Sequence, residues 1–239
     1  MKRIILLVLL FLSFNVLLAD NPYKVQILGG FAVPFRKYET GLALTQTYEH
    51  LKFRPGGSFD FGLKVGYEFN PKVETDLKIH YQISYLTPGA SNVDDRFTKL
   101  MLQPEVLYIL SLTKSVKFKF GGGLSYAINP VFDIDATQIQ GGAHNIFYFK
   151  NSLGFALSAE HEIYLRKKKN LSFVTGFSFR YNIIKVDHVI SDGNPAAIDY
   201  FPSGFGNNLK ELNAGGLDIS MGVRYHFELA GKNRVYEYE

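Results

Sequence analysis

Apolar and polar residues alternate with a period of two along much of this chain. The clearest stretch is residues 58–69, where Phe59, Phe61, Leu63, Val65, Tyr67 and Phe69 share one face, and Ser58, Asp60, Gly62, Lys64, Gly66 and Glu68 the other. Successive side chains of a β-strand point to opposite faces, whereas a helix repeats about every 3.6 residues. The pattern therefore predicts strands with one apolar face and one polar face.

Eight segments carry this pattern, and the connections between them alternate in length. The predicted strands cover residues 23–35, 58–69, 73–85, 99–110, 116–128, 152–164, 171–183 and 217–227. Short connections at 70–72, 111–115 and 166–170 are interleaved with long ones at 36–57, 86–98, 129–148 and 185–212. Bacterial outer-membrane barrels have an even number of strands, short periplasmic turns and long outer loops. We therefore expect an all-β, eight-stranded antiparallel up-and-down transmembrane barrel with both ends in the periplasm.

Alternation alone also fits a soluble lipocalin-like barrel, whose apolar face points inward. Two features favour apolar faces that point outward into lipid. The apolar faces run for about a dozen residues, enough for the ~9–11 residues of a tilted strand that crosses the hydrocarbon. Small residues, which weaken a solvated strand but make room in a narrow lumen, lie on the polar face. They are Gly62, Gly66, Gly121, Gly123, Gly154, Ala156, Gly176 and Gly222.

The inward-facing charges balance in number under this interpretation. The acids are Asp60, Glu68, Glu74, Asp76, Glu105, Glu160, Glu162 and Asp218, and the bases are Lys24, Lys64, Lys78, Lys99, Lys117, Lys119, Arg180 and Arg224. Unpaired buried charge is costly, so opposite charges in a narrow interior should pair. We expect ion pairs among Asp60, Lys64, Glu68, Asp76, Lys78, Glu105, Lys117, Lys119, Glu160, Arg180, Asp218 and Arg224. A structural plug is favoured over an ion path, which stays open as the alternative.

The N-terminal residues are predicted to be a cleaved signal peptide. Lys2 and Arg3 precede the apolar run 4–12, and Ala19-Asp20 is a suitable cleavage point. The run is shorter than the ~20 residues of a spanning helix. This divides the chain into a signal peptide (1–19), a barrel (20–227) and a short periplasmic tail (228–239).

Composition narrows the classes of partner and site. Without Lys2 and Arg3, 24 of the 26 basic residues remain against 22 acidic ones, so no affinity for nucleic acid is predicted. The chain has no cysteine, which excludes disulfides, thiolate metal sites and lipid attachment to an N-terminal cysteine. Phe and Tyr are abundant, and residues 147–149 are expected to join the aromatic girdle at the membrane interface.

The last predicted strand resembles the C-terminal targeting signal of outer-membrane barrels. In that signal a polar residue is followed by Gly two positions later and by apolar or aromatic residues five and seven positions later, as in Ser220, Gly222, Tyr225 and Phe227. The resemblance implies insertion into the bacterial outer membrane, among its lipids, by the barrel assembly machinery. The chain departs from the commonest form because residues 228–239 follow Phe227. Over residues 23–227 the layout is similar to small barrels of the OmpA-barrel, OmpX and OmpW type.

No catalytic, cofactor-binding or metal-binding residue is predicted, and no cofactor. The His-x-Ser pair of barrel lipid deacylases does not occur, and His80 and Ser84 on one strand would lie roughly 13 Å apart. Residues 133–137 have spaced oxygens but lack the Gly and closing Glu of a calcium loop. Lumen histidines are expected to pair with neighbouring charges.

The expected role is that of a non-enzymatic, monomeric barrel that is structural or binds an unidentified partner through its long outer loops. An OmpW-like conduit for small apolar molecules is the alternative. It draws support from the inward-facing Leu28, Met101, Leu107 and Val174. A lipid-modifying enzyme is the less favoured third possibility.

Overall fold

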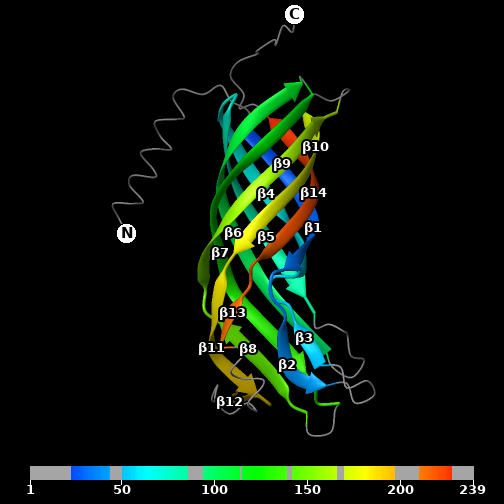
Figure 1. Ribbon diagram of the computed structural model, residues 1–239, viewed down its shortest axis with the longest axis vertical. Coiled ribbons are helices and arrows are strands. Elements are labelled where there is room, and N and C mark those ends of the chain that lie inside the picture. The colour runs from blue at the N-terminus through cyan, green and yellow to red at the C-terminus, as the bar shows by residue number, and fades with distance from the viewer. Residues whose placement is uncertain are drawn as a thin grey trace, which may run out of the picture.

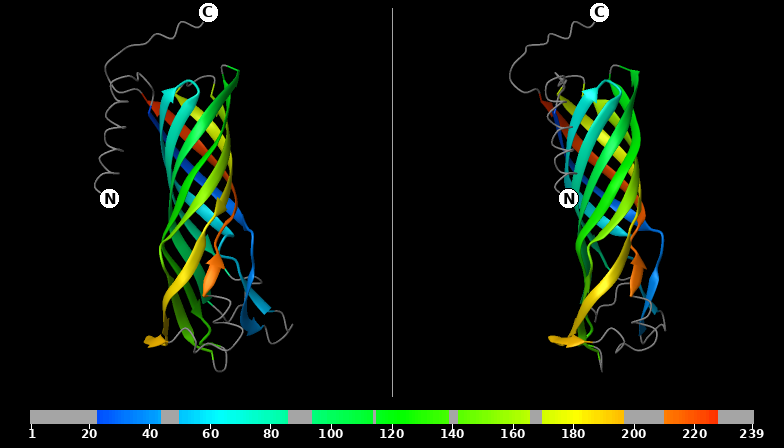
Figure 2. Two further views of the ribbon diagram at one scale, coloured as in Figure 1. Left: turned by 60° about the vertical axis from the view of Figure 1, so that its left-hand side comes forward. Right: turned by 90° about the vertical axis from the view of Figure 1, so that its left-hand side faces the viewer.

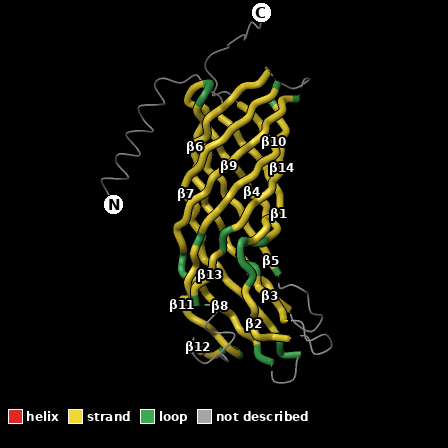
Figure 3. Tube along the Cα trace, in the orientation of Figure 1, coloured by secondary structure: helices red, strands yellow, loops and turns green. Residues whose placement is uncertain are grey.

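A computed structural model describes residues 23–43, 50–85, 94–113, 115–138, 142–165, 170–196 and 210–227. The regular structure in these ranges consists of β-strands (Figure 3). No helix in the described ranges is long and apolar enough to cross a membrane. The predicted signal peptide (1–19) and C-terminal tail (228–239) lie outside the described residues.

Eight strands form a closed antiparallel barrel, which confirms the predicted fold (Figures 1 and 2). Around the ring, each strand pairs with the next and β14 pairs with β1. Closure gives both edges of every strand a partner, as a sheet in lipid requires. The ring consists of β1 (Tyr23–Pro34), β4 (Ser58–Asn70), β5 (Val73–Ser84), β6 (Asp94–Thr113), β7 (Val116–Asp135), β9 (Ser152–Tyr164), β10 (Leu171–Tyr181) and β14 (Gly216–Phe227).

The apolar faces of these strands point outward. Ile27 is 68% exposed and Phe59 67%, whereas the charged side chain of Lys119 is fully buried inside the barrel. The soluble lipocalin-like arrangement would require the opposite and is therefore wrong. Small residues make room in the lumen as predicted: a Cβ atom on Gly66 would overlap the carboxylate of Asp76.

The sheet continues beyond the barrel on the side away from the short turns, the lower end in Figure 1. Strands β6 and β7 have 20 residues each, about twice the ~9–11 residues with which a tilted strand crosses the hydrocarbon. Beyond β9 and β10, β7 pairs with β8 (His144–Phe149), β8 with β11 (Ile183–Ser191), and β11 with β12 (Asn194–Ala196) and β13 (Glu211–Asn213). We call β8, β11, β12 and β13, together with the ends of β6 and β7 that lie beyond the barrel, the outer extension. The connections expected at 86–98, 129–148 and 185–212 thus contain strands.

Local breaks reverse the inward face where the barrel passes into the extension. At Asn129, whose φ is 44°, β7 changes its partner from β9 to β8. Asn is one of the few residue types that adopt this left-handed conformation readily. The Asn129 amide donates a hydrogen bond to Oδ1 of Asn151 (2.8 Å), which lies in the matching break between β8 and β9. In the barrel part of β7, odd-numbered residues such as Ala127 point inward. After the break, the even-numbered residues Phe132 and Ile134 point inward instead.

The outer extension has an apolar core of its own. Tyr38, at the start of the hairpin β2 (Tyr38–Ala43) and β3 (His50–Phe53), packs against this core, and its hydroxyl accepts a hydrogen bond from the Asn213 amide (2.6 Å). The core consists of Phe97, Phe132, Ile134, Ala136, Phe147, Phe149, Ile184, Val186, Val189, Leu212 and Ala214.

The prediction that residues 147–149 join the aromatic girdle is wrong for two of the three. Phe147 and Phe149 are buried in the outer core, because the break at residues 150–151 turns them inward. Tyr148 is half-buried, and its ring stacks on His188 at a centroid distance of 4.5 Å.

Candidate functional site in the barrel lumen

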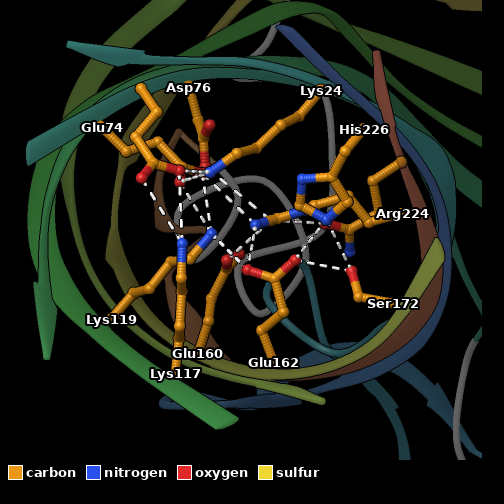
Figure 4. Close-up of polar contacts among 12 residues, drawn as sticks. Lys24, Glu74, Asp76, Lys117, Lys119, Glu160, Glu162, Ser172, Arg224 and His226 are labelled. Carbon is orange, nitrogen blue, oxygen red and sulfur yellow. Dashed lines mark hydrogen bonds and ion pairs between the residues drawn. The ribbon is translucent and has the colours of Figure 1, made fainter. Parts of the chain in front are cut away.

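Arg224 lies at the centre of a charged network in the periplasmic half of the lumen (Figure 4). Its guanidinium nitrogens lie 2.8 Å from Glu160 and 3.3 Å from both Glu162 and Glu74. The side-chain oxygen of Gln26 accepts two further hydrogen bonds, from Nε (2.9 Å) and from a terminal nitrogen (2.6 Å). Arg224 is almost completely buried, so these partners replace the water that a free guanidinium would bind.

Two lysines from other strands join the same carboxylates. Nζ of Lys119 lies 2.7 Å from Glu74 and 2.7 Å from Glu162, and Lys24 also pairs with Glu74. Glu74 therefore contacts three cations that come from β1, β7 and β14. Such multiple pairing compensates the desolvation that a single buried pair does not.

Glu68 and Lys117 lie at the periplasmic mouth. Glu68 pairs with Lys24 (2.6 Å) and with Lys117 (3.4 Å). Lys117 is the more solvated of these, with 20% of its side chain exposed, and its ammonium lies 5.4 Å from the centre of the Tyr164 ring.

Lys64 closes the middle of the lumen. Its ammonium lies 2.5 Å from Glu160, 2.7 Å from Asp76 and 3.3 Å from Glu105. A cavity of about 10 Å³ borders Lys64 and Glu105, which is room for about one water molecule. Charged side chains therefore fill this level of the barrel.

A second group of charges lies nearer the outer end. Asp60 contacts Nδ1 of His80 (3.1 Å) and Lys78 (3.8 Å). Arg180 binds Asp218 through two nitrogens. We call this group, together with Lys99, the outer layer.

Each of the twelve residues predicted to form ion pairs lies within ion-pair distance of an opposite charge. The structure divides them between two levels. Lys64, Glu68, Asp76, Glu105, Lys117, Lys119, Glu160 and Arg224 lie in the periplasmic and middle levels, and Asp60, Lys78, Arg180 and Asp218 in the outer layer. Uncharged members such as Gln26 and Ser172 are not among the predicted residues. Their inward parity is visible in the alternation, but an ion-pair prediction covers charged residues alone.

Ser172, His226 and Glu162 resemble a catalytic triad only in composition. Nε2 of His226 lies 3.0 Å from the Ser172 hydroxyl and 2.8 Å from Glu162. In an acyl-transfer triad the acid holds the ring nitrogen that does not face the serine. Here both contacts use the same nitrogen, and Ser172 is fully buried. The arrangement suits a buried hydrogen-bonded contact, not a nucleophile.

The four residues of the predicted insertion signal lie on β14, which closes the barrel against β1. Ser220 lies opposite Gly30 of β1, and Gly222 opposite Leu28. Tyr225 is 47% exposed, and the ring of Phe227 stacks on Tyr23 at 5.8 Å. Their role in insertion remains a prediction.

The tip of the outer extension carries exposed acids around His144. Nε2 of His144 lies 2.8 Å from Asp133, and this hydrogen bond raises the pKa of the imidazole. Hydrogen bonds from the amide and hydroxyl of Thr137 lower the pKa of Asp135. Within the described ranges, no three histidine or acidic side chains converge as metal ligands would.

A closed eight-stranded barrel with an apolar outer surface and a charged, filled interior defines a small β-barrel protein of the bacterial outer membrane. No protein-family model matches the sequence, and no curated protein matches it.

Solved structures show the same fold. The outer membrane protein OprG from Pseudomonas aeruginosa has a TM-score of 0.57 and 14% identity, over 88% of this chain and 97% of OprG. A major outer membrane protein from Thermus thermophilus has a TM-score of 0.54 and 16% identity, over 86% of this chain and 99% of that protein. The outer membrane protease OmpT from Escherichia coli is also similar, at a TM-score of 0.33 and 8% identity, over 87% of this chain and 97% of OmpT, which is too distant to bear on activity.

Proposed function

We propose that this protein is a non-enzymatic barrel with a closed lumen that anchors a folded binding surface outside the outer membrane. The observation that carries the proposal is the apolar core of the outer extension, which contains eleven buried residues. Surface loops that serve only as connections need no such core. Function is often carried by segments that a rigid scaffold positions, and here β6 and β7 each extend from the barrel into the extension.

The filled lumen supports a structural role rather than transport. Lys119 and Arg180 are fully buried, and Arg224 and Lys24 are 1% exposed. A hydrated path past these side chains would leave them accessible to solvent. Their contacts instead join opposite walls of the barrel and stabilise its closed form.

A conduit for apolar molecules receives less support. The inward apolar residues of the barrel lie in separate places: Leu28 and Val174 flank Gly222, whereas Met101 and Leu107 lie on β6. Met101 lies opposite His80, and Leu107 opposite Glu74. An apolar solute would therefore meet charged side chains at each level.

Single-channel recording tests the closed lumen. Purified protein refolded into planar bilayers is expected to show no steady conductance, because buried charged and polar side chains fill each level of the barrel. A porin reconstituted into the same membranes provides the positive control. A stable open level that scales with the amount of protein inserted would refute the closed lumen.

A further inference from the structure

The equal numbers of acids and bases in the barrel conceal an uneven distribution. In the outer layer, the cations Lys78, Lys99 and Arg180 accompany only two carboxylates, Asp60 and Asp218. With His80 neutral and Lys99 protonated, the layer carries one positive charge in excess. An uncompensated buried charge is strongly unfavourable.

Lys99 is the source of the excess. It is 1% exposed, and its ammonium donates hydrogen bonds to the backbone carbonyls of Pro55 and Ala214, both at 3.0 Å. Among the residues that the structure describes, no carboxylate lies within ion-pair distance of Lys99. Carbonyl dipoles solvate the ammonium partly, but they do not neutralise it.

Other buried donors of this layer also lack protein partners. Arg180 uses two nitrogens on Asp218, and its third nitrogen has no partner. Neither the nitrogen nor the oxygen of the Gln82 amide is bonded, and the hydroxyls of Ser58 and Ser84 are also unpaired. Buried polar groups are normally hydrogen-bonded, and a concentration of exceptions marks a place where something else binds.

These groups lie close together. Gln82 of β5 lies directly between Asp60 of β4 and Lys99 of β6 in the sheet register, so the side chains are adjacent on the inward face. Arg180, Asp218 and Asp60 are the charged groups near enough to act on the Lys99 ammonium. Lys99 itself reaches the carbonyl of Ala214, which lies shortly before β14 on the far wall.

We propose that the outer layer binds one small monovalent anion, of the size of a halide or formate, held by Lys99, the free Arg180 nitrogen and the Gln82 amide. One such anion neutralises the excess charge and supplies the acceptor that these donors lack. A neutral solute or water alone would satisfy the hydrogen bonds but leave the charge. A cation is disfavoured, because it would add to that charge.

Anion-dependent stability tests the proposal. The refolded protein is heated in detergent at constant ionic strength while chloride replaces gluconate, a much larger organic anion. Binding to the folded state alone stabilises it, so the unfolding midpoint should rise with chloride and then saturate. Lys99→Met should abolish this saturable rise, and the surface variant Lys150→Met, at a lysine whose side chain is 65% exposed, should retain it. An equal response in wild type and Lys99→Met would overturn the proposal.

A second measurement uses the unaltered protein, because Lys99→Met itself can affect folding. In crystals grown with bromide, an anomalous peak within contact distance of Lys99 Nζ is expected. Bromide only at exposed lysines such as Lys150, an adventitious ion only, would overturn the proposal.

Discussion

Substitution of Arg224 by methionine is expected to lower the free energy of unfolding by about 3–5 kcal/mol, the range for removal of one partner from a buried ion network. Three carboxylates, Glu74, Glu160 and Glu162, surround the guanidinium. Without it they keep their burial but lose a shared cation. Urea unfolding of the refolded barrel in detergent micelles measures the difference. It is followed on unheated gels by the loss of the band of the compact folded barrel, which heating abolishes.

A matched surface variant and a double variant separate charge from packing. Lys185 pairs with Glu211 at 2.9 Å, but both side chains are more than half exposed, so Lys185→Met should change stability by no more than about 1 kcal/mol. Adding Glu160→Gln to Arg224→Met should restore part of the loss, because one of the uncompensated charges disappears. The network would be contradicted if the losses of stability from Arg224→Met and Glu160→Gln simply added in the double variant. It would also be contradicted if Arg224→Met left the free energy of unfolding unchanged.

Substitution of Phe132 by alanine is expected to destabilise the outer extension by about 3–5 kcal/mol, the range for large-to-small changes of a buried aromatic residue. Phe132 is fully buried, and its ring stacks on Phe147 at 5.9 Å. Amide hydrogen exchange in β8 and β11 should accelerate by roughly 10²–10⁴-fold, since about 1.4 kcal/mol corresponds to a factor of ten.

The effect should be local. Exchange in β4 and β5 should stay unchanged, because these strands have no residue in the outer core. Tyr148→Ala, on the outward face of the same extension, should produce a smaller change. Equal acceleration throughout the barrel would mean that the extension is not a separately stabilised unit, and unchanged exchange would mean that its core contributes nothing.

The sequence predicted the barrel because strict alternation over a whole span leaves little freedom. A shift of one residue would move every charge of 58–69 into lipid and every aromatic residue into the lumen. The outer extension could not be predicted in this way. Breaks at Asn129 and Asn151 reverse the inward parity, so the two halves of β7 look like a strand followed by a loop, and β8 does not look like part of the same sheet.

The membership of the lumen was predictable, but its pairing was not. Parity places Lys64 inside, yet its partner Glu160 lies 96 residues away on β9, across the barrel. Which acid meets which base depends on the stagger of the strands around the ring, and the alternation pattern does not encode that stagger. For the same reason, the equal charge totals gave no sign that Lys99 lacks a carboxylate.

Site-specific labelling in intact cells tests the central claim most directly, namely that a barrel of the outer membrane carries the extension on the cell surface. The chain has no cysteine, so each introduced cysteine is unique. His188→Cys, at an exposed site of the extension, should react with a membrane-impermeant maleimide. Lys72→Cys, in the short turn between β4 and β5, should react only after the outer membrane is permeabilised. Labelling of Lys72→Cys but not His188→Cys in intact cells, or of neither variant until the cells are lysed, would contradict the account.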